Sequence, residues 1–405
     1  MNKDELIDVG GDGRTCYPVS RLELERRWAL LRECLARHQL DAIVLQGANG
    51  VSGGGYFRWA TGQASGNYNP RTVVFAASGD MSLIDQGPFG MAVDLDPNAG
   101  PMPGISHRIG VPSYPSVHYT NRYDAELVVR ELRRRGLGRI GVAGITAMPF
   151  AFYSYLQSTY GADLVDVTDE LDVLKAPKSE EEKRLIRASA AMQDRIVAKV
   201  AEHIRPGMRD FEVMAYAQYL GQLEGSELGM FFGSSAPPGQ PAVLRPRSQQ
   251  GRKLHDGDMF TLLVENSGPG GQFTHLARPI VLGKAPQELK DAWAAALEAQ
   301  TVTLDMLAPG ADCAEIFAKY NEHMLSRGLA IESRLHCHGQ GYDLVERPLI
   351  RHDETMHLSA DMNIAAHPAL VMERLFVTVC ENYLINADGS LECVHKSPKN
   401  IIELC

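Results

Sequence analysis

Residues 257–278 read GDMFTLLVENSGPGGQFTHLAR, a pattern typical of two β-strands joined by a glycine-rich turn. Strand-forming residues lie on both sides of a Gly/Pro turn at 267–271. If the hairpin is centred on Gly270, Glu265 and His275 are each five residues from that centre. We therefore expect these two ionisable side chains to face each other across the strands.

Three further strand-like segments also carry ionisable residues. The segment at 335–341, LHCHGQG, places His338 on an extended chain beside glycines that allow close approach of the backbone. His367 follows the apolar run at 364–366, and the run FVTVCE at 376–381 predicts one strand that ends with Glu381. Each of these side chains alone is more often a hydrogen-bonded structural residue, but their concentration after residue 250 predicts a functional site.

The first part of the chain alternates helix and strand patterns. Apolar residues at three- and four-residue spacing predict a helix over 21–38, and strands are predicted at 41–45, 72–76 and 139–143. This alternation favours an α/β domain with a layered sheet. A structure-breaking stretch at 174–179 places the boundary near residue 175, which gives domains 1–174 and 175–405.

The second part contains a weak internal repeat. A Pro-Gly turn follows Ile204 and another follows Leu307, and the residues after each turn also match at an offset of 103. In both copies the turn joins two helical patterns. Coincidence is the simpler explanation because Pro-Gly turns are common, but the extended match favours two similar halves related by a pseudo-two-fold axis.

Composition excludes several classes of partner. The chain has 405 residues, with 40 Lys plus Arg and 50 Asp plus Glu, so its formal charge of −10 has the wrong sign for a nucleic-acid-binding surface. No apolar run approaches the ~20 residues that span a bilayer, and the seven cysteines have no disulfide-framework or zinc-knuckle spacing. We therefore expect a cytoplasmic protein with no nucleic-acid or membrane partner.

Several motifs together resemble the creatinase/aminopeptidase P/methionine aminopeptidase superfamily. They are the Pro-Gly turns, the Gly-Asp pair at 257–258, the His-Gly-x-Gly motif at 338–341, the His-Pro pair at 367–368, and Glu381 before a hairpin. The resemblance covers nearly the whole chain. It implies an α/β (α+β) fold, with an N-terminal creatinase-like domain and a C-terminal catalytic "pita-bread" domain made of two duplicated halves.

The resemblance also implies a metal site, although with changed ligands. Peptidases of this type hold two divalent metals with two Asp, one His and two Glu. Matching their pattern places His275 at the second Asp, His338 at the His, His367 at the first Glu and Glu381 at the last Glu. The first Asp falls on an apolar residue, with Glu265 nearby as a further candidate ligand.

Three imidazoles with one or two carboxylates suit a single Fe, Zn or Mn ion better than a carboxylate-bridged pair. Two other histidines of the family are absent, because they fall at 244–247 and on Val345. The shifted hairpin most resembles the dimethylsulfoniopropionate lyase branch. We therefore expect an enzyme that is not a peptidase.

The main hypothesis is a metal-dependent hydrolase or lyase that cleaves a C–N or C–S bond of a small, carboxylate-bearing substrate. Glu265 or Glu381 would act as a ligand or as the general base. The alternatives are a metal-free amidinohydrolase like creatinase, an iron-dependent oxygenase with a histidine-rich site, and a binding protein without catalysis.

Four residues are candidates for binding the substrate. Arg245 or Arg247 would hold a carboxylate at the edge of the cleft, and Trp59 would form an aromatic wall for a cationic group, although each is individually more often structural. In creatinase-like relatives an arginine before an N-terminal strand reaches the partner's active site. Arg71 stands in that place, which predicts a homodimer.

Overall fold

The computed structural model describes residues 14–47, 51–64 and 69–404. The chain divides into two compact units, Met1–Lys175 and Ala176–Cys405. No helix in these described ranges is long and apolar enough to cross a membrane.

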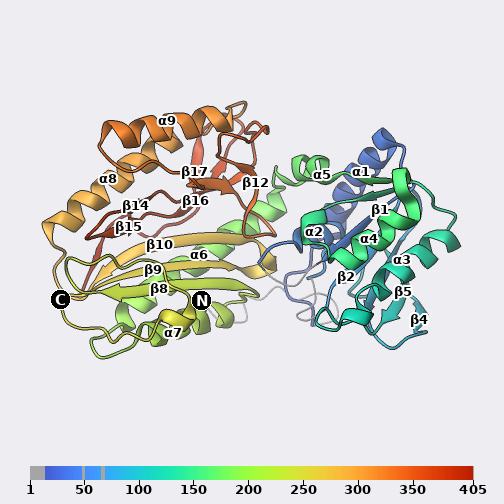
Figure 1. Ribbon diagram of the computed structural model, residues 1–405, viewed down its shortest axis with the longest axis horizontal. Coiled ribbons are helices and arrows are strands. Elements are labelled where there is room, and N and C mark those ends of the chain that lie inside the picture. The colour runs from blue at the N-terminus through green and yellow to red at the C-terminus, as the bar shows by residue number, and fades with distance from the viewer. Residues whose placement is uncertain (1–13, 48–50, 65–68, 405) are drawn as a thin grey trace. The chain divides into compact units, whose positions relative to one another are not determined.

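The first unit is a mixed β-sheet covered by helices (Figure 1). The sheet order over its described residues is β4-β5-β3-β2-β1-β6-β7. The predicted first helix is confirmed as α1, and the Ser20 side chain caps it by accepting a hydrogen bond from the backbone N–H of Glu23. The elements are α1 (Arg21–His38), β1 (Ala42–Gly47), α2 (Gly55–Thr61), β2 (Arg71–Ala76), β3 (Met81–Gln86), β4 (Ala92–Asp94), β5 (Ile105–Val111), α3 (Tyr123–Arg134), β6 (Ile140–Val142), α4 (Phe150–Tyr160), β7 (Leu164–Asp166) and α5 (Thr168–Lys175).

The second unit contains two larger sheets, each covered by a pair of helices. Over the described residues the sheet orders are β18-β10-β9-β8 and β12-β11-β13-β16-β17, and β14 pairs with β15. The elements are α6 (Glu180–His203), α7 (Asp210–Leu223), β8 (Gly229–Ala236), β9 (Met259–Ser267), β10 (Phe273–Val281), α8 (Gln287–Leu304), α9 (Cys313–Ser326), β11 (Cys337–Gly339), β12 (Glu346–Leu349), β13 (Asn363–Ala366), β14 (Ala369–Val371), β15 (Phe376–Thr378), β16 (Glu381–Ile385), β17 (Leu391–Cys393) and β18 (Ile402–Glu403).

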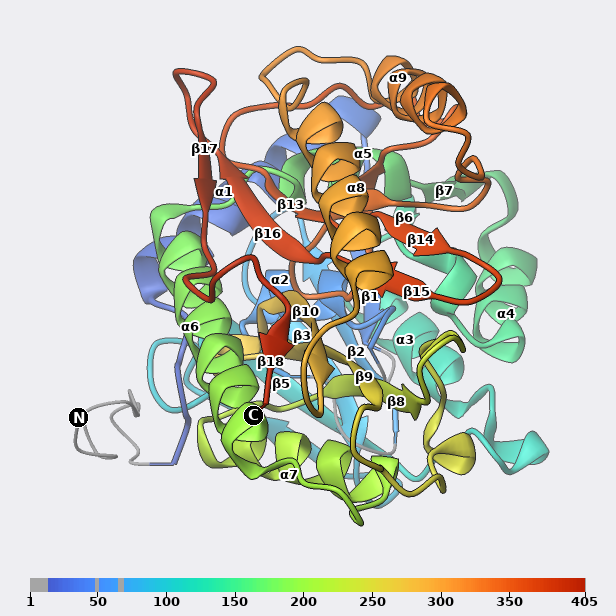
Figure 2. The same ribbon diagram turned by 90° about the vertical axis from the view of Figure 1, so that its left-hand side faces the viewer.

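The internal repeat is visible in the helices of this unit. Helices α6 and α7 flank one Pro-Gly turn, and α8 and α9 flank the other. Figure 2 shows α6 and α8 as two long, separate helices of the same unit, with β16 seen between them. The predicted α/β fold with two similar halves is therefore confirmed, and it agrees with the pita-bread architecture.

The predicted hairpin is formed by β9 and β10, and Glu265 pairs with His275 as expected. Alternate residues of β9, including Phe260, Leu262 and Val264, pack into the core with α6 and α7. Because successive side chains of a strand point to opposite faces, Glu265 points away from these helices.

The two larger sheets meet where β10 runs beside the start of β16. The backbone N–H of His275 donates to the Asn382 side chain at 2.9 Å, and Ala277 forms an isolated bridge with Cys380. The predicted single strand over 376–381 is therefore wrong. Residues Phe376–Thr378 pair with β14, whereas Glu381 begins β16 in the five-stranded sheet, so the two ends of the run belong to different sheets.

Candidate metal centre

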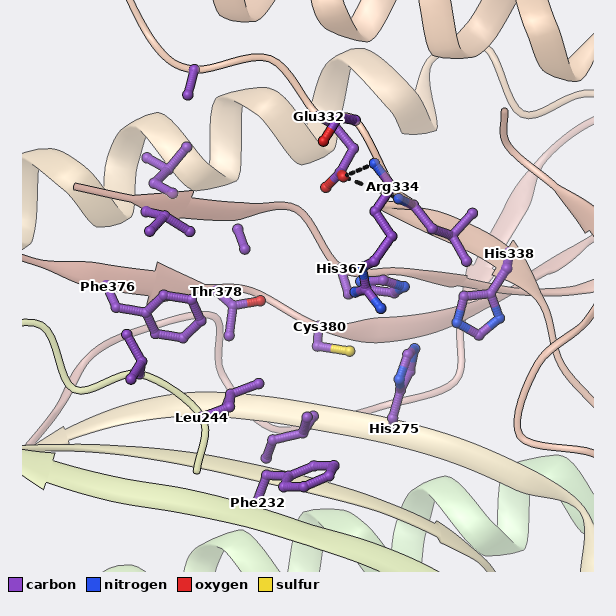
Figure 3. A pocket seen from close by; sticks show the side chains of 18 of the residues that line it. Phe232, Leu244, His275, Glu332, Arg334, His338, His367, Phe376, Thr378 and Cys380 are labelled. Carbon is purple, nitrogen blue, oxygen red and sulfur yellow. Dashed lines mark hydrogen bonds between the residues drawn. The ribbon is translucent and has the colours of Figure 1, made fainter. Parts of the chain in front are cut away.

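Three histidines from separate elements of the second unit point toward one another (Figure 3). His275 lies in β10, His338 in β11, and His367 directly after β13. The ring centroids are 5.4 Å apart for His275 and His338, 5.1 Å for His275 and His367, and 5.0 Å for His338 and His367. One ring nitrogen from each lies within 4.8 Å of the others. This spacing allows all three to contact one ion.

The local backbone explains why His338 and His367 point inward. The register of β11 against β12 shifts between His338 and Gly339. A side chain at Gly339 would meet the backbone oxygen of Arg347 at 2.5 Å, so the two strands approach this closely only with glycine. The backbone N–H of His367 donates to the His336 oxygen at 2.8 Å, which fixes the turn before Pro368.

Hydrogen bonds set the orientation of two of the rings. Nδ1 of His275 lies 3.0 Å from Oε1 of Glu265, and Nδ1 of His338 lies 2.8 Å from the backbone oxygen of Gly339. Because both partners are acceptors, each Nδ1 carries the proton and each Nε2 keeps its lone pair. Nε2 of His275 and of His367 are buried and have no hydrogen-bond partner among the described residues.

Burial keeps the imidazoles of His338 and His367 uncharged at neutral pH. It lowers the pKa of His338 to about 4, with a further contribution from His275, and it lowers the pKa of His367 well below its ordinary value. Neutral imidazoles are the form that binds metals. Unpartnered nitrogens of this kind fit a divalent transition metal, and an ion there would satisfy them.

Glu265 supports His275 and also lines the cavity beside the three histidines. Burial alone would raise its pKa, but interaction with His275 lowers it below the ordinary value, so the side chain is a carboxylate. A carboxylate bonded to the outer nitrogen of a metal-binding histidine fixes the ring and makes it a better ligand.

The structure does not bring Glu381 into the group of three histidines. Its oxygens instead contact Arg278 at 2.5 Å, Tyr383 at 2.8 Å and Lys399 at 2.8 Å. Burial would raise the pKa of Glu381, but Arg278 and Lys399 lower it. The predicted role of Glu381 as a ligand or base has no support in this geometry, because two cations already neutralise its charge.

A cavity of about 820 Å³ opens beside the three histidines. Its lining includes Phe232, Leu244 and Phe376, which lie away from the histidines in Figure 3. Cys380 also lines the cavity, and burial raises the pKa of its thiol well above the ordinary value, so it is protonated. The cavity therefore combines an apolar region with a compact polar end.

None of the four predicted substrate-binding residues is among the residues that line this cavity. Arg245 is exposed and donates to Gln249 at 3.2 Å, and Arg247 lies 5.4 Å from the ring of Phe211. Trp59 is 1% exposed in the core of the first unit. Arg71, in the same unit, contacts Asp85 at 3.4 Å.

Sequence reasoning missed several polar or charged residues that line the cavity, among them Arg334, Thr378 and Cys380. Arg334 lies in the loop between α9 and β11, where no periodic pattern exists to indicate its direction. Thr378 and Cys380 belong to the run that was expected to form one continuous strand.

Comparison with known proteins identifies peptidases as relatives. The model of metallopeptidase family M24 matches residues 184–387. The Xaa-Pro dipeptidase of Pyrococcus horikoshii is 23% identical over 274 residues, which cover 63% of this chain and 72% of that protein. The probable dipeptidase PepE of Mycobacterium tuberculosis is 23% identical over 266 residues, or 65% of this chain and 70% of that protein.

Solved structures share the fold over almost the whole chain. The X-Pro aminopeptidase of Thermotoga maritima aligns with a TM-score of 0.76 and 16% identity, covering 94% of this chain and 99% of that one. The Xaa-Pro dipeptidase of Bacillus anthracis gives a TM-score of 0.74 and 17% identity with the same coverage.

These relatives confirm the superfamily but contradict the expectation that the chain is not a peptidase. The expectation rested on the loss of the carboxylate ligands, yet the relatives are named dipeptidases. The placement in a lyase branch has no support among the relatives described above. Changed ligands are therefore a variation within a peptidase family and do not exclude peptide substrates.

Proposed function

The chain belongs to metallopeptidase family M24, and we propose that it is a metal-dependent hydrolase that cleaves an amide bond of a small, peptide-like substrate. One divalent ion would be held by His275, His338 and His367. The observation that carries the proposal is the set of buried, unpartnered imidazole nitrogens that face one another. A divalent ion bound there supplies Lewis acidity for amide hydrolysis.

The protein's own groups perform the remaining tasks. Glu265 holds His275 in the tautomer whose Nε2 is free, and its carboxylate is the cavity-lining group that accepts a proton from the attacking water. Apolar side chains such as Phe232 and Phe376 line one end of the cavity and would pack against an apolar part of the substrate. These roles place the reacting amide beside the three histidines, at the end of the cavity that Glu265 also lines.

We propose one ion per chain, whereas the two-metal peptidase pattern that the sequence resembles would hold two. Two bridging carboxylates of the family pattern are imidazoles here, and an imidazole nitrogen has a single lone pair with which to bind one ion. Glu381, which would bind the second ion, is already paired with Arg278 and Lys399. Metal analysis of the purified protein determines whether this ion is Fe, Zn or Mn.

Two further features belong to the proposal. One is a homodimer in which Arg71 of one protomer contributes to substrate binding in the other. The other is a cytoplasmic location, which is supported by free thiols at six cysteines of the described part of the chain.

The test combines metal analysis with peptide turnover. Purified protein is analysed by plasma mass spectrometry and then assayed with a panel of Xaa-Pro and other dipeptides. We expect close to one transition-metal ion per chain and measurable hydrolysis, both lost in His338→Ala. His352→Ala is the control because His352 is exposed and lies outside the three-histidine group. Full turnover by His338→Ala would contradict the proposal.

A further inference from the structure

Arg334 is the only lysine or arginine among the described residues that line the cavity of the second unit. Figure 3 shows its side chain extending from the loop before β11 toward His367. Arg334 lines the cavity together with His338, His367 and Glu265. A guanidinium therefore lies at the polar end of the cavity, close to the proposed reacting centre.

The Arg334 guanidinium has no hydrogen bond or ion pair with any described residue. The nearest acidic neighbour in the loop, Glu332, uses Oε1 to accept the backbone N–H groups of Arg334 at 2.5 Å and of Leu335 at 3.0 Å. Arginine side chains present five donors in a planar fork that matches a carboxylate. Here that fork is available to a ligand.

The loop that carries Arg334 is held in place by specific contacts. The Asn321 side chain accepts the backbone N–H of Glu332 at 2.8 Å and donates to its backbone oxygen at 3.1 Å. Arg351 donates to the backbone oxygen of Arg334 at 3.4 Å. These contacts fix the backbone of Arg334 before any ligand arrives, which reduces the ordering that binding requires.

We propose that Arg334 binds the free carboxylate of the substrate while the scissile amide lies at the three histidines. This inference rests on the proposed amide hydrolysis and adds to it the residue that recognises the substrate's carboxylate. Within the second unit, Arg245 and Arg247 were the arginines that the sequence indicated for this task. The cavity instead holds Arg334.

The charges in the cavity favour a carboxylate over a phosphate. Besides Arg334, the charged lining residues are Glu265 and Glu332, so a single guanidinium faces two carboxylates. A monoanion is compatible with this balance, whereas a dianion would be repelled more strongly. The apolar side chains of Phe232, Leu244 and Phe376 then fit an apolar group on the rest of the substrate.

Calorimetry with a non-hydrolysable probe tests the proposal on the metal-loaded protein. The probe is a reduced-amide analogue of leucyl-proline, in which CH₂ replaces the scissile carbonyl, prepared as the free acid and as the C-terminal carboxamide. We expect the acid to bind at least about tenfold more tightly, as a charge-assisted hydrogen bond predicts. Arg334→Gln should remove this preference, and Arg334→Lys should retain part of it.

Arg327→Gln is the matched control, because Arg327 lies in the same connection and its guanidinium forms an ion pair with the exposed Glu298. It should keep the full preference for the acid. Circular dichroism verifies that each variant is folded. Equal affinity of the two probes, binding of neither, or a preference that survives in Arg334→Gln would overturn the proposal. Displacement of the acid by inorganic phosphate at lower concentration than by acetate would also overturn the assignment to a carboxylate.

The outcomes separate this inference from the proposed function. If no dipeptide is hydrolysed but the preference for the acid depends on Arg334, the hydrolase proposal fails and the carboxylate site stands. If dipeptides are hydrolysed and the acid and carboxamide bind equally, the hydrolase proposal stands and the role of Arg334 is refuted.

Discussion

Replacing Glu265 by glutamine tests whether the three histidines form a metal site and whether Glu265 supports it through its hydrogen bond to His275. Glu265 is 7% exposed, and its Oε1 lies 3.0 Å from Nδ1 of His275. The Glu265→Gln variant keeps the size of the side chain but removes its charge. It also introduces an amide nitrogen that, if turned toward Nδ1, favours the tautomer with the proton on Nε2. Both effects weaken His275 as a ligand.

The expected magnitude follows from the type of contact. Substituting a group that hydrogen-bonds the outer nitrogen of a metal-binding histidine typically lowers metal affinity by about 10- to 100-fold. This range corresponds to about 1.4–2.7 kcal/mol of binding free energy. The upper part of the range applies here, because the contact is buried and the acceptor is a carboxylate.

The assay is competition with a chromogenic chelator for Zn²⁺ and Mn²⁺, performed on the intact chain at neutral pH. Glu354→Gln is the control, since Glu354 is a buried carboxylate that pairs with Arg347 and does not line the cavity. Its metal affinity should match that of the unmodified chain. An affinity of Glu265→Gln within about twofold of the unmodified chain, or an equal loss in both variants, would refute the reasoning.

Three further predictions concern stability and assembly. Arg278→Met removes a partner of the buried Glu381 and should lower the free energy of unfolding by about 3–5 kcal/mol in urea titrations; a change below about 1 kcal/mol would contradict the ion pair's role. Burial lowers the pKa of His336 to about 3, so the unfolded chain binds a proton that the folded chain resists. The free energy of unfolding should therefore decrease as the pH falls from about 6.5 to about 3, and this group should account for up to about 4 kcal/mol of the decrease. In urea titrations at several pH values, His336→Phe should show a smaller decrease over the same pH range. Arg71→Ala should sediment as a dimer and raise KM several-fold; a monomer that is fully active would remove Arg71 from the site.

Local patterns predicted the part of the site that lies on one hairpin. The strand period of two and a compact turn fix the register, so the pairing of Glu265 with His275 follows from the sequence. The two helix pairs around the Pro-Gly turns were predictable for a similar reason, because short connections between amphipathic segments leave few arrangements.

The position of Glu381 was not predictable from its own segment. The run at 376–381 has a uniform strand pattern, but β15 pairs with β14 while Cys380 bridges to Ala277 in β10. The interruption redirects Glu381 toward Arg278 and Lys399. Long-range pairing therefore overrode the local periodicity, and the cations that bind Glu381 could not be identified without the fold.

Arg334 shows a second limit of sequence reasoning. Arg245 and Arg247 lie where the family has a histidine that this chain lacks. For that reason the sequence pointed to them and not to an arginine in another loop. The direction of Arg334 depends on Asn321 and on Glu332, whose hydrogen bonds to the backbone arise only when α9 and the loop are folded together. Loop side chains carry no periodicity from which their partners can be deduced.

The changed ligands and Arg334 have a common electrostatic consequence. Carboxylate ligands would cancel much of the charge of bound metal, whereas neutral imidazoles add no negative charge. The carboxylate of Glu265, which is hydrogen-bonded to Nδ1 of His275, offsets part of that charge. Arg334 adds a further positive charge at the same end of the cavity. A metal-loaded site of the proposed kind would therefore attract an anion more strongly than a carboxylate-bridged site, and it would favour substrates whose carboxylate lies close to the bond that is cleaved.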